Sequence, residues 1–166
     1  MQERSSSVSM TILMTPDMAN FSGNVHGGTI LKILDQVAFS CASRYARSYV
    51  VTLSVDQVVF REPVRVGELV TFLASINYTG RTSMEVGVRV ETEDIRTHKV
   101  RHTNSCYFTM VAVDDSMVPI PVPQKELLTR EDEQRFEEAK ARRELRAEME
   151  RRRQEIKDHV RYRPRG

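Results

Sequence analysis

The stretch that decides the fold is NFSGNVHGGTILKILDQVAFSCASRY, from Asn20 to Tyr45. Its second part carries apolar residues at three- and four-residue steps, the period of a helix with one buried face. The residues expected on that face are Ile30, Ile33, Leu34, Val37, Ala38, Cys41, Ala42 and Tyr45. Ahead of them lies a loop with three glycines and a histidine, where few side chains keep a ligand away from the backbone. The stretch therefore predicts one amphipathic helix with an accessible loop at its start.

Asp35 falls at the edge of the apolar face, on the side of Leu31 and Gly28. Its neighbours Leu31 and Ala38 predict partial burial, where a lone carboxylate is costly unless it has a partner or a task. Partial desolvation makes a carboxylate a better general base. The alternative is an acid that is placed in the N-terminal half of the helix by the helix dipole.

Other polar groups of the loop have two interpretations each. Gly27 and Gly28 form a tight turn with close packing, or they offer backbone N–H groups at a helix N-terminus to a developing oxyanion. Asn20 and Asn24 are turn or cap residues, or an amide that orients a water molecule beside a carboxylate. His26 is a hydrogen-bonded residue at the helix start, or a general base.

The segment Gly80-Arg81-Thr82-Ser83 connects two strand patterns and predicts a hairpin turn. Its alternative role is phosphate binding, because it offers one guanidinium, two hydroxyls and free N–H groups. No Walker-type loop, dinucleotide-binding glycine pattern or G-x-S-x-G nucleophile elbow occurs in the sequence. The residues alone thus indicate a hydrolase-like or ligand-binding domain.

Length and composition indicate one globular domain with an appendage: the chain has 166 residues, 40% hydrophobic and 29% charged. No apolar run is long enough for a membrane span, and the N-terminus lacks the apolar core of a signal peptide. Cys41 and Cys106 are expected to be small buried residues in a reducing cytoplasm. The four histidines and two cysteines show no zinc-type spacing, so no metal is expected.

Charge separates the two parts of the chain. Residues 1–124 carry 11 basic and 12 acidic side chains, whereas residues 125–166 carry 14 basic and 11 acidic ones. Neither part is basic enough to imply a nucleic-acid partner.

The pattern along the chain predicts an α+β domain. Strands are expected at 8–14, 50–60, 69–78, 83–93 and 99–113, with the long helix between the first two. Short hairpin links make the last four strands mostly antiparallel. One strongly apolar helix must then be covered by the sheet.

Four regions follow from this pattern: residues 1–7 disordered, a domain at 8–118, a Pro-rich linker at 119–128, and a charged helix and tail at 129–166. Thr129 and Asp132 have capping-box spacing, and a helix is expected from Arg130 to about His159. Its thin apolar stripe indicates a solvated helix with weak docking to a neighbouring subunit. The alternative is binding of acidic ligands or RNA by the arginines at 151–153.

The motif P-D-x-A-N-x-x-G-N-V-H-G-G-x-I-L-x-x-L-D-x-V-A, from Pro16 to Ala38, resembles the hotdog-fold acyl-CoA thioesterases. It is most similar to the bacterial cytosolic acyl-CoA hydrolases related to brain-type acyl-CoA hydrolase. The resemblance continues through VVTLSVD at 50–56, PVRVGE at 63–68, NYTGRTSMEV at 77–86 and FTMVAVD at 108–114. It thus covers residues 8–128.

The resemblance implies a long central helix wrapped by a curved antiparallel sheet, with a C-terminal helical extension. It also implies protomers that join their sheets, active sites at the protomer interface, and a homo-oligomer that is a dimer at minimum and a trimer of dimers in this subgroup. Localisation is expected to be cytoplasmic, with no membrane or nucleic-acid partner.

The family's catalytic acid corresponds to Asp35, and its catalytic asparagine, contributed by the facing subunit, corresponds to Asn20. Gly27 and Gly28 correspond to the oxyanion site, with Asn24 and His26 as possible supporting residues. Arg81, Thr82 and Ser83 are similar to the part that holds coenzyme A. No cofactor is implied, because coenzyme A belongs to substrate and product.

Asp35 is either a general base or a nucleophile that forms a transient anhydride. Two other functions stay open, a hotdog dehydratase or hydratase acting on acyl thioesters and a non-enzymatic acyl-CoA sensor.

Overall fold

The computed structural model describes residues 5–161, which fall into two compact units with the boundary after Lys125. The first unit holds β1 (Ser7–Leu13), the short 3₁₀ helix η1 (Pro16–Met18), α1 (Gly27–Ala46), β2 (Tyr49–Val55), β3 (Leu69–Thr79), β4 (Ser83–Glu93) and β5 (Val100–Val113). The second unit holds α2 (Arg130–Arg161).

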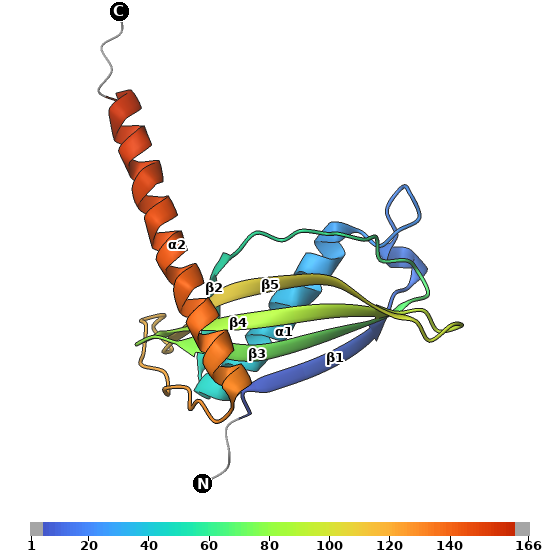
Figure 1. Ribbon diagram of the computed structural model, residues 1–166, viewed down its shortest axis with the longest axis horizontal. Coiled ribbons are helices and arrows are strands. Elements are labelled where there is room, and N and C mark those ends of the chain that lie inside the picture. The colour runs from blue at the N-terminus through green and yellow to red at the C-terminus, as the bar shows by residue number, and fades with distance from the viewer. Residues whose placement is uncertain (1–4, 162–166) are drawn as a thin grey trace, which may run out of the picture. The chain divides into compact units, whose positions relative to one another are not determined.

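One five-stranded sheet with the order β1-β3-β4-β5-β2 forms the first unit, and every pairing is antiparallel (Figure 1). The sheet curls around α1, which contacts all five strands. This arrangement is the hotdog fold, an α+β architecture in which the curved sheet wraps around the central helix. The predicted fold class and the antiparallel sense of the pairing are confirmed, but the expected hairpin between β2 and β3 is wrong, because β2 pairs with β5.

The buried face of α1 is the one that the sequence predicts. The helix buries Ile30, Ile33, Leu34, Val37, Ala38, Cys41, Ala42 and Tyr45, all eight of the expected residues. From the sheet, large side chains such as Phe72 and Phe108 are fully buried against them. Each such burial contributes about 1.5–3 kcal/mol, which fixes the helix, and hence its polar edge, against the sheet. At its end, Arg47 adopts φ 57° and its amide donates to the Ser43 carbonyl at 2.8 Å.

Most strand boundaries lie within one residue of the prediction, and the end of β2 differs most. β2 ends at Val55 rather than at Phe60, because after the Asp56 amide bonds to the Tyr107 carbonyl (2.9 Å) the chain leaves β5. β1 begins at Ser7, and the Ile76 amide donates to the Ser6 carbonyl at 2.9 Å. The predicted disorder of residues 1–7 is therefore wrong for residues 5–7, and residues 1–4 lie outside the described part.

The predicted linker at 119–128 is also not a free linker over its first half. Prolines at every second position remove amide donors, but the intervening amides of Ile120 and Val122 donate to Ala112 and Arg81 carbonyls, both at 2.9 Å. The Lys125 amide then donates to Thr79 Oγ1 at 2.9 Å. The segment thus lies along the sheet, and the boundary between units falls after Lys125.

α2 is a 32-residue helix whose start has the predicted capping box. The Asp132 amide donates to Thr129 Oγ1 at 3.1 Å, and the Thr129 amide donates to Asp132 Oδ2 at 3.2 Å. Among residues 5–161, no helix is both long and apolar enough to cross a membrane.

Candidate active site

Backbone hydrogen bonds fix the loop that leads into α1. The Val25 amide donates to the Val64 carbonyl and the His26 amide to the Met18 carbonyl, both at 2.8 Å. The Val64 segment is itself anchored by buried Glu68, which accepts from the Arg65 amide (2.8 Å) and from Arg101 Nη2 (2.6 Å). The start of α1 is therefore held in place by the sheet end next to it.

Gly27 and Gly28 are the first two residues of α1, where amides have no partner within the helix. The next amides, of Thr29 and Ile30, already donate to the His26 carbonyl. In the part of the chain that the structure describes, no hydrogen bond from the Gly27 or Gly28 amide to another protein group is found. Two N–H groups thus point out of a helix N-terminus, the geometry that binds a developing negative charge.

Neither glycine is required by the packing of its own chain. A Cβ at Gly27 would meet the Phe60 ring at 3.6 Å, an ordinary contact, and one at Gly28 would meet His26 Nδ1 at 3.9 Å. Both residues have ordinary helical backbone. The predicted alternative of unusually close packing is therefore not supported, because a Cβ at either position would make only ordinary contacts.

Asp35 lies about two turns into α1 and accepts a hydrogen bond from Thr52 Oγ1 at 2.6 Å. Thr52 lies on β2, where it pairs with Met110. The hydroxyl thus orients the carboxylate against the sheet. Contrary to the prediction of partial burial, Asp35 is exposed, and Leu31 beside it is 38% exposed. Within one protomer, the carboxylate is supported on the side of β2 and is otherwise exposed to solvent.

The residue pattern did not identify Thr52 as a functional residue. A threonine in a β-branched strand is unremarkable, since threonine favours strands. One signal was available, because Thr52 is a polar residue inside the family motif at 50–56. Its partner is 17 residues away, so the contact depends on how the helix packs on the sheet.

Asn20 orders the loop with its own side chain. Its Oδ1 accepts from the Ser22 amide (2.9 Å), the Ser22 hydroxyl (2.7 Å) and the Asn24 amide (3.2 Å). The Asn24 side chain donates to Ser22 Oγ at 3.2 Å, so it serves the same loop. Within residues 5–161 no hydrogen bond joins Asn20 to Asp35 of the same chain. His26 is exposed and makes no side-chain capping bond to α1.

The hairpin with Arg81, Thr82 and Ser83 lies at the other end of the sheet. Its turn closes with the Gly80 amide donating to the Ser83 carbonyl at 2.8 Å. β3 separates this turn from the sheet end beside the α1 loop; its 11 residues span about 36 Å. The hairpin is thus far from the start of α1 but not from Asp35: Thr52, which holds Asp35, pairs with Met110, and Met110 pairs with Met84 beside Ser83.

The edge of the sheet nearest Asp35 is unpartnered. β2 is an edge strand, and it exposes Tyr49 (58%), Leu53 (68%) and Val55 (43%). An exposed apolar edge is a place where a second chain adds to the sheet. The site therefore lies at an open surface of the protomer.

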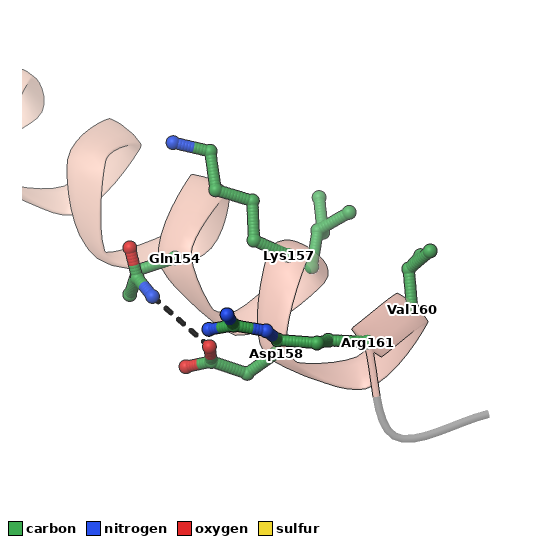
Figure 2. A pocket seen from close by; sticks show the side chains of 6 residues that line it. Gln154, Lys157, Asp158, Val160 and Arg161 are labelled. Atoms are coloured by element: carbon green, nitrogen blue, oxygen red, sulfur yellow. Dashed lines mark hydrogen bonds between the residues drawn. The ribbon is translucent and has the colours of Figure 1, made fainter.

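Two other features fall outside this site. A shallow hollow near the end of α2 is lined by Gln154, Ile156, Lys157, Asp158, Val160 and Arg161, all on one helix (Figure 2). Burial raises the pKa of the Cys41 and Cys106 thiols to about 12, so neither is a ready nucleophile. Residues 5–161 contain no group of three or more His, Cys, Asp or Glu side chains that could hold a metal ion.

Known proteins match both the sequence and the fold. Residues 22–99 match the family model of the Thioesterase superfamily. Protein VdlD of Helicobacter pylori is 52% identical over 137 residues, which cover 82% of this chain and 78% of that protein. The cytosolic acyl coenzyme A thioester hydrolase of Rattus norvegicus is 34% identical over 136 residues, 81% of this chain and 36% of that protein.

Solved structures of acyl-CoA hydrolases have a similar fold. An apo-hexameric acyl-CoA thioesterase is 40% identical with a TM-score of 0.84, over 87% of this chain and 92% of that chain. The acyl-CoA hydrolase of Staphylococcus aureus, solved with butyryl coenzyme A and coenzyme A, is 30% identical with a TM-score of 0.82, over 95% and 94% of the two chains. The chain belongs to the thioesterase superfamily, in its hotdog-fold group of acyl-CoA hydrolases.

Proposed function

We propose that this protein hydrolyses fatty acyl-CoA to a free fatty acid and coenzyme A. The observation that carries the proposal is the Asp35 carboxylate, held by Thr52 at 2.6 Å on the open edge of a helix whose first two amides are unpartnered. A carboxylate that activates water and donors that receive an oxyanion are sufficient for a thioester, whose thiolate leaves readily.

The chemistry follows from these positions. Asp35 accepts a proton from a water molecule as the water oxygen attacks the thioester carbonyl carbon. The N–H groups of Gly27 and Gly28 stabilise the negative oxygen of the tetrahedral intermediate. Its collapse breaks the carbon–sulfur bond, and the coenzyme A thiolate takes up the proton. The resemblance leaves the nucleophilic role of Asp35 as the alternative.

Each site is proposed to be shared between two chains, with Asn20 of the facing subunit beside Asp35. Three features support this arrangement: Asp35 has no cover in its own protomer, β2 is an exposed edge, and Asn20 makes no bond to its own Asp35. Asn20 Oδ1 already accepts three hydrogen bonds within its own loop. The side-chain NH₂ group is therefore the part that would orient the substrate or water. Asn24 and His26 support the loop.

Spacing in a relative supports the same set of residues. The Staphylococcus aureus hydrolase has been solved with alanine in place of one asparagine, one aspartate and one threonine. Those three positions are 15 and 17 residues apart, as are Asn20, Asp35 and Thr52 here. The coincidence adds Thr52 to the residues proposed for the site.

Arg81, Thr82 and Ser83 are proposed to hold the phosphates or pantetheine of coenzyme A. The resemblance implies active sites at the protomer interface, so these residues are proposed to serve a site that another subunit completes. A homohexamer built as a trimer of dimers is the proposed assembly, by analogy with the hexameric relative. The proposed reaction needs no cofactor, and the proposed location is the cytoplasm.

A thiol-release assay across fatty acyl-CoA chain lengths tests this function. Wild-type protein is expected to release coenzyme A thiol, and Asp35→Ala is expected to fold and assemble normally but to lose most turnover. Gln36→Ala, a change at the adjacent exposed helix position, is the matched control and should retain activity. Unchanged turnover in Asp35→Ala would overturn the site, and no release from any chain length would overturn the activity.

A further inference from the structure

An apolar stripe on α2 has no partner in the described chain. Leu145 (64%), Met149 (54%), Ile156 (64%) and Val160 (66%) are all largely exposed. Their spacing of four, seven and four residues puts them on one side of the helix. Ile156 and Val160 are the apolar lining of the hollow in Figure 2. On a helix that is otherwise strongly polar, such a stripe marks an interaction surface.

The stripe has the spacing of a coiled-coil seam. In a heptad frame, Leu145 takes position d and both Met149 and Ile156 take position a. An isoleucine at a and a leucine at d favour two strands. Arg152 takes the next d position, where Glu148 neutralises it at 2.7 Å on the same helix. His159 takes the last d position, so the apolar part of the seam is short.

Charged residues flank the seam with opposite signs. The two g positions hold Glu148 and Glu155, and the two e positions before Val160 hold Arg146 and Arg153. In a parallel pair, position g of one helix faces position e of the next heptad on the other helix. Glu148 then faces Arg153 of the partner subunit, twice by symmetry. In an antiparallel pair, g faces g and e faces e, so glutamates meet glutamates and arginines meet arginines.

We propose that α2 pairs with α2 of a second copy of this chain, as a parallel, in-register two-stranded coiled coil over residues 145–160. The three arginines at 151–153 do not form an open basic patch that would favour an acidic ligand. Arg151 and Arg152 pair with Glu148, and Arg153 lies 4.0 Å from Glu150. The apolar stripe, with its two flanks of opposite charge, fits a second copy better.

About two heptads are too short to hold free helices together. Pairing therefore depends on the folded first unit to bring two chains close and raise their effective concentration. This step relies on the oligomer proposed above. The test below reads covalent dimers rather than turnover, so it can fail while the enzyme remains active.

Cysteine cross-linking in the full-length chain tests the pairing. In a parallel, in-register pair, identical residues of the seam face each other, so Leu145→Cys and Ile156→Cys should each form a disulfide-linked dimer on mild oxidation. Ala147→Cys, exposed on the opposite side of α2, is the matched control and should remain monomeric on a denaturing gel. The native Cys41 and Cys106 are buried and contribute no background.

Two results would overturn the proposal. One is the absence of cross-links at both seam positions, or cross-linking of Ala147→Cys to the same extent. The other is preferential heterodimer formation when Leu145→Cys and Ile156→Cys chains are mixed, which indicates antiparallel helices. Charge reversal gives a further check: Glu148→Lys should reduce cross-linking of Ile156→Cys several-fold, and adding Arg153→Glu to the same chain should restore it.

Discussion

Replacing Thr52 with valine removes the hydroxyl that orients Asp35 and leaves a side chain of nearly the same shape. Thr52 Oγ1 donates to Asp35 Oδ1 at 2.6 Å, and a hydrogen bond to a charged group contributes about 1.5–3 kcal/mol. Asp35 is exposed in the protomer, so the lower end of that range applies. A loss of about 1.4 kcal/mol in the transition state lowers kcat about tenfold.

Steady-state kinetics with fatty acyl-CoA measure this effect. Because Thr52 touches Asp35 and not the proposed coenzyme A residues, kcat should fall while KM stays near the wild-type value. Thr52→Ser keeps the donor and should restore most of the rate. Valine favours strands, so thermal unfolding should be nearly unchanged. A full wild-type kcat in Thr52→Val would refute the orienting role, and so would a serine variant as slow as the valine variant.

Two further predictions concern the fold. Gly87→Ala should lower the free energy of unfolding by about 1–3 kcal/mol, because a Cβ there collides with the buried Asn77 side chain; calorimetry should show a lower Tm, and an unchanged Tm would contradict the packing. Cys41 and Cys106, with thiol pKa values raised to about 12 by burial, should stay unreactive to a thiol reagent near pH 8 until the protein unfolds; rapid labelling of the native protein would contradict their burial.

The sequence was most informative where one periodic signal dominated. All eight predicted core residues of α1 are buried. Apolar residues with helical spacing lie on one face of the helix, and that face is buried when it packs on the sheet. The hairpin strands were equally clear: β4 spans Ser83–Glu93, as expected from strict alternation. Here local pattern and tertiary packing favour the same structure.

Prediction failed where the outcome depended on a neighbouring strand. Residues 50–60 are rich in β-branched side chains, yet after the Asp56 amide bonds to Tyr107 the chain leaves β5 and Phe60 ends beside Gly27. The prolines at 119–123 suggested a linker, but the amides between them find acceptors on the sheet. A local sequence pattern does not show which backbone carbonyls from distant parts of the chain will accept hydrogen bonds from these amides.

Only part of the proposed site could be predicted from the sequence. Asp35 and the two glycines followed from the helix pattern, whereas Thr52 became visible only when the helix lay on the sheet. The expected burial of Asp35 did not occur within one chain. Local sequence cannot show whether a side chain at the edge of a helix is covered by its own chain or, as proposed here, by a second one.

Mixing Asn20→Ala with Asp35→Ala protein tests the shared site most directly. Each variant alone should be nearly inactive. After dissociation and reassembly in equal amounts, half of the dimers are hybrids with one intact site of two, so thiol release should recover to about a quarter of wild-type activity. Unmixed variants taken through the same treatment are the control. If activity stays at the level of the parent variants at every mixing ratio, Asn20 and Asp35 do not act across the subunit interface.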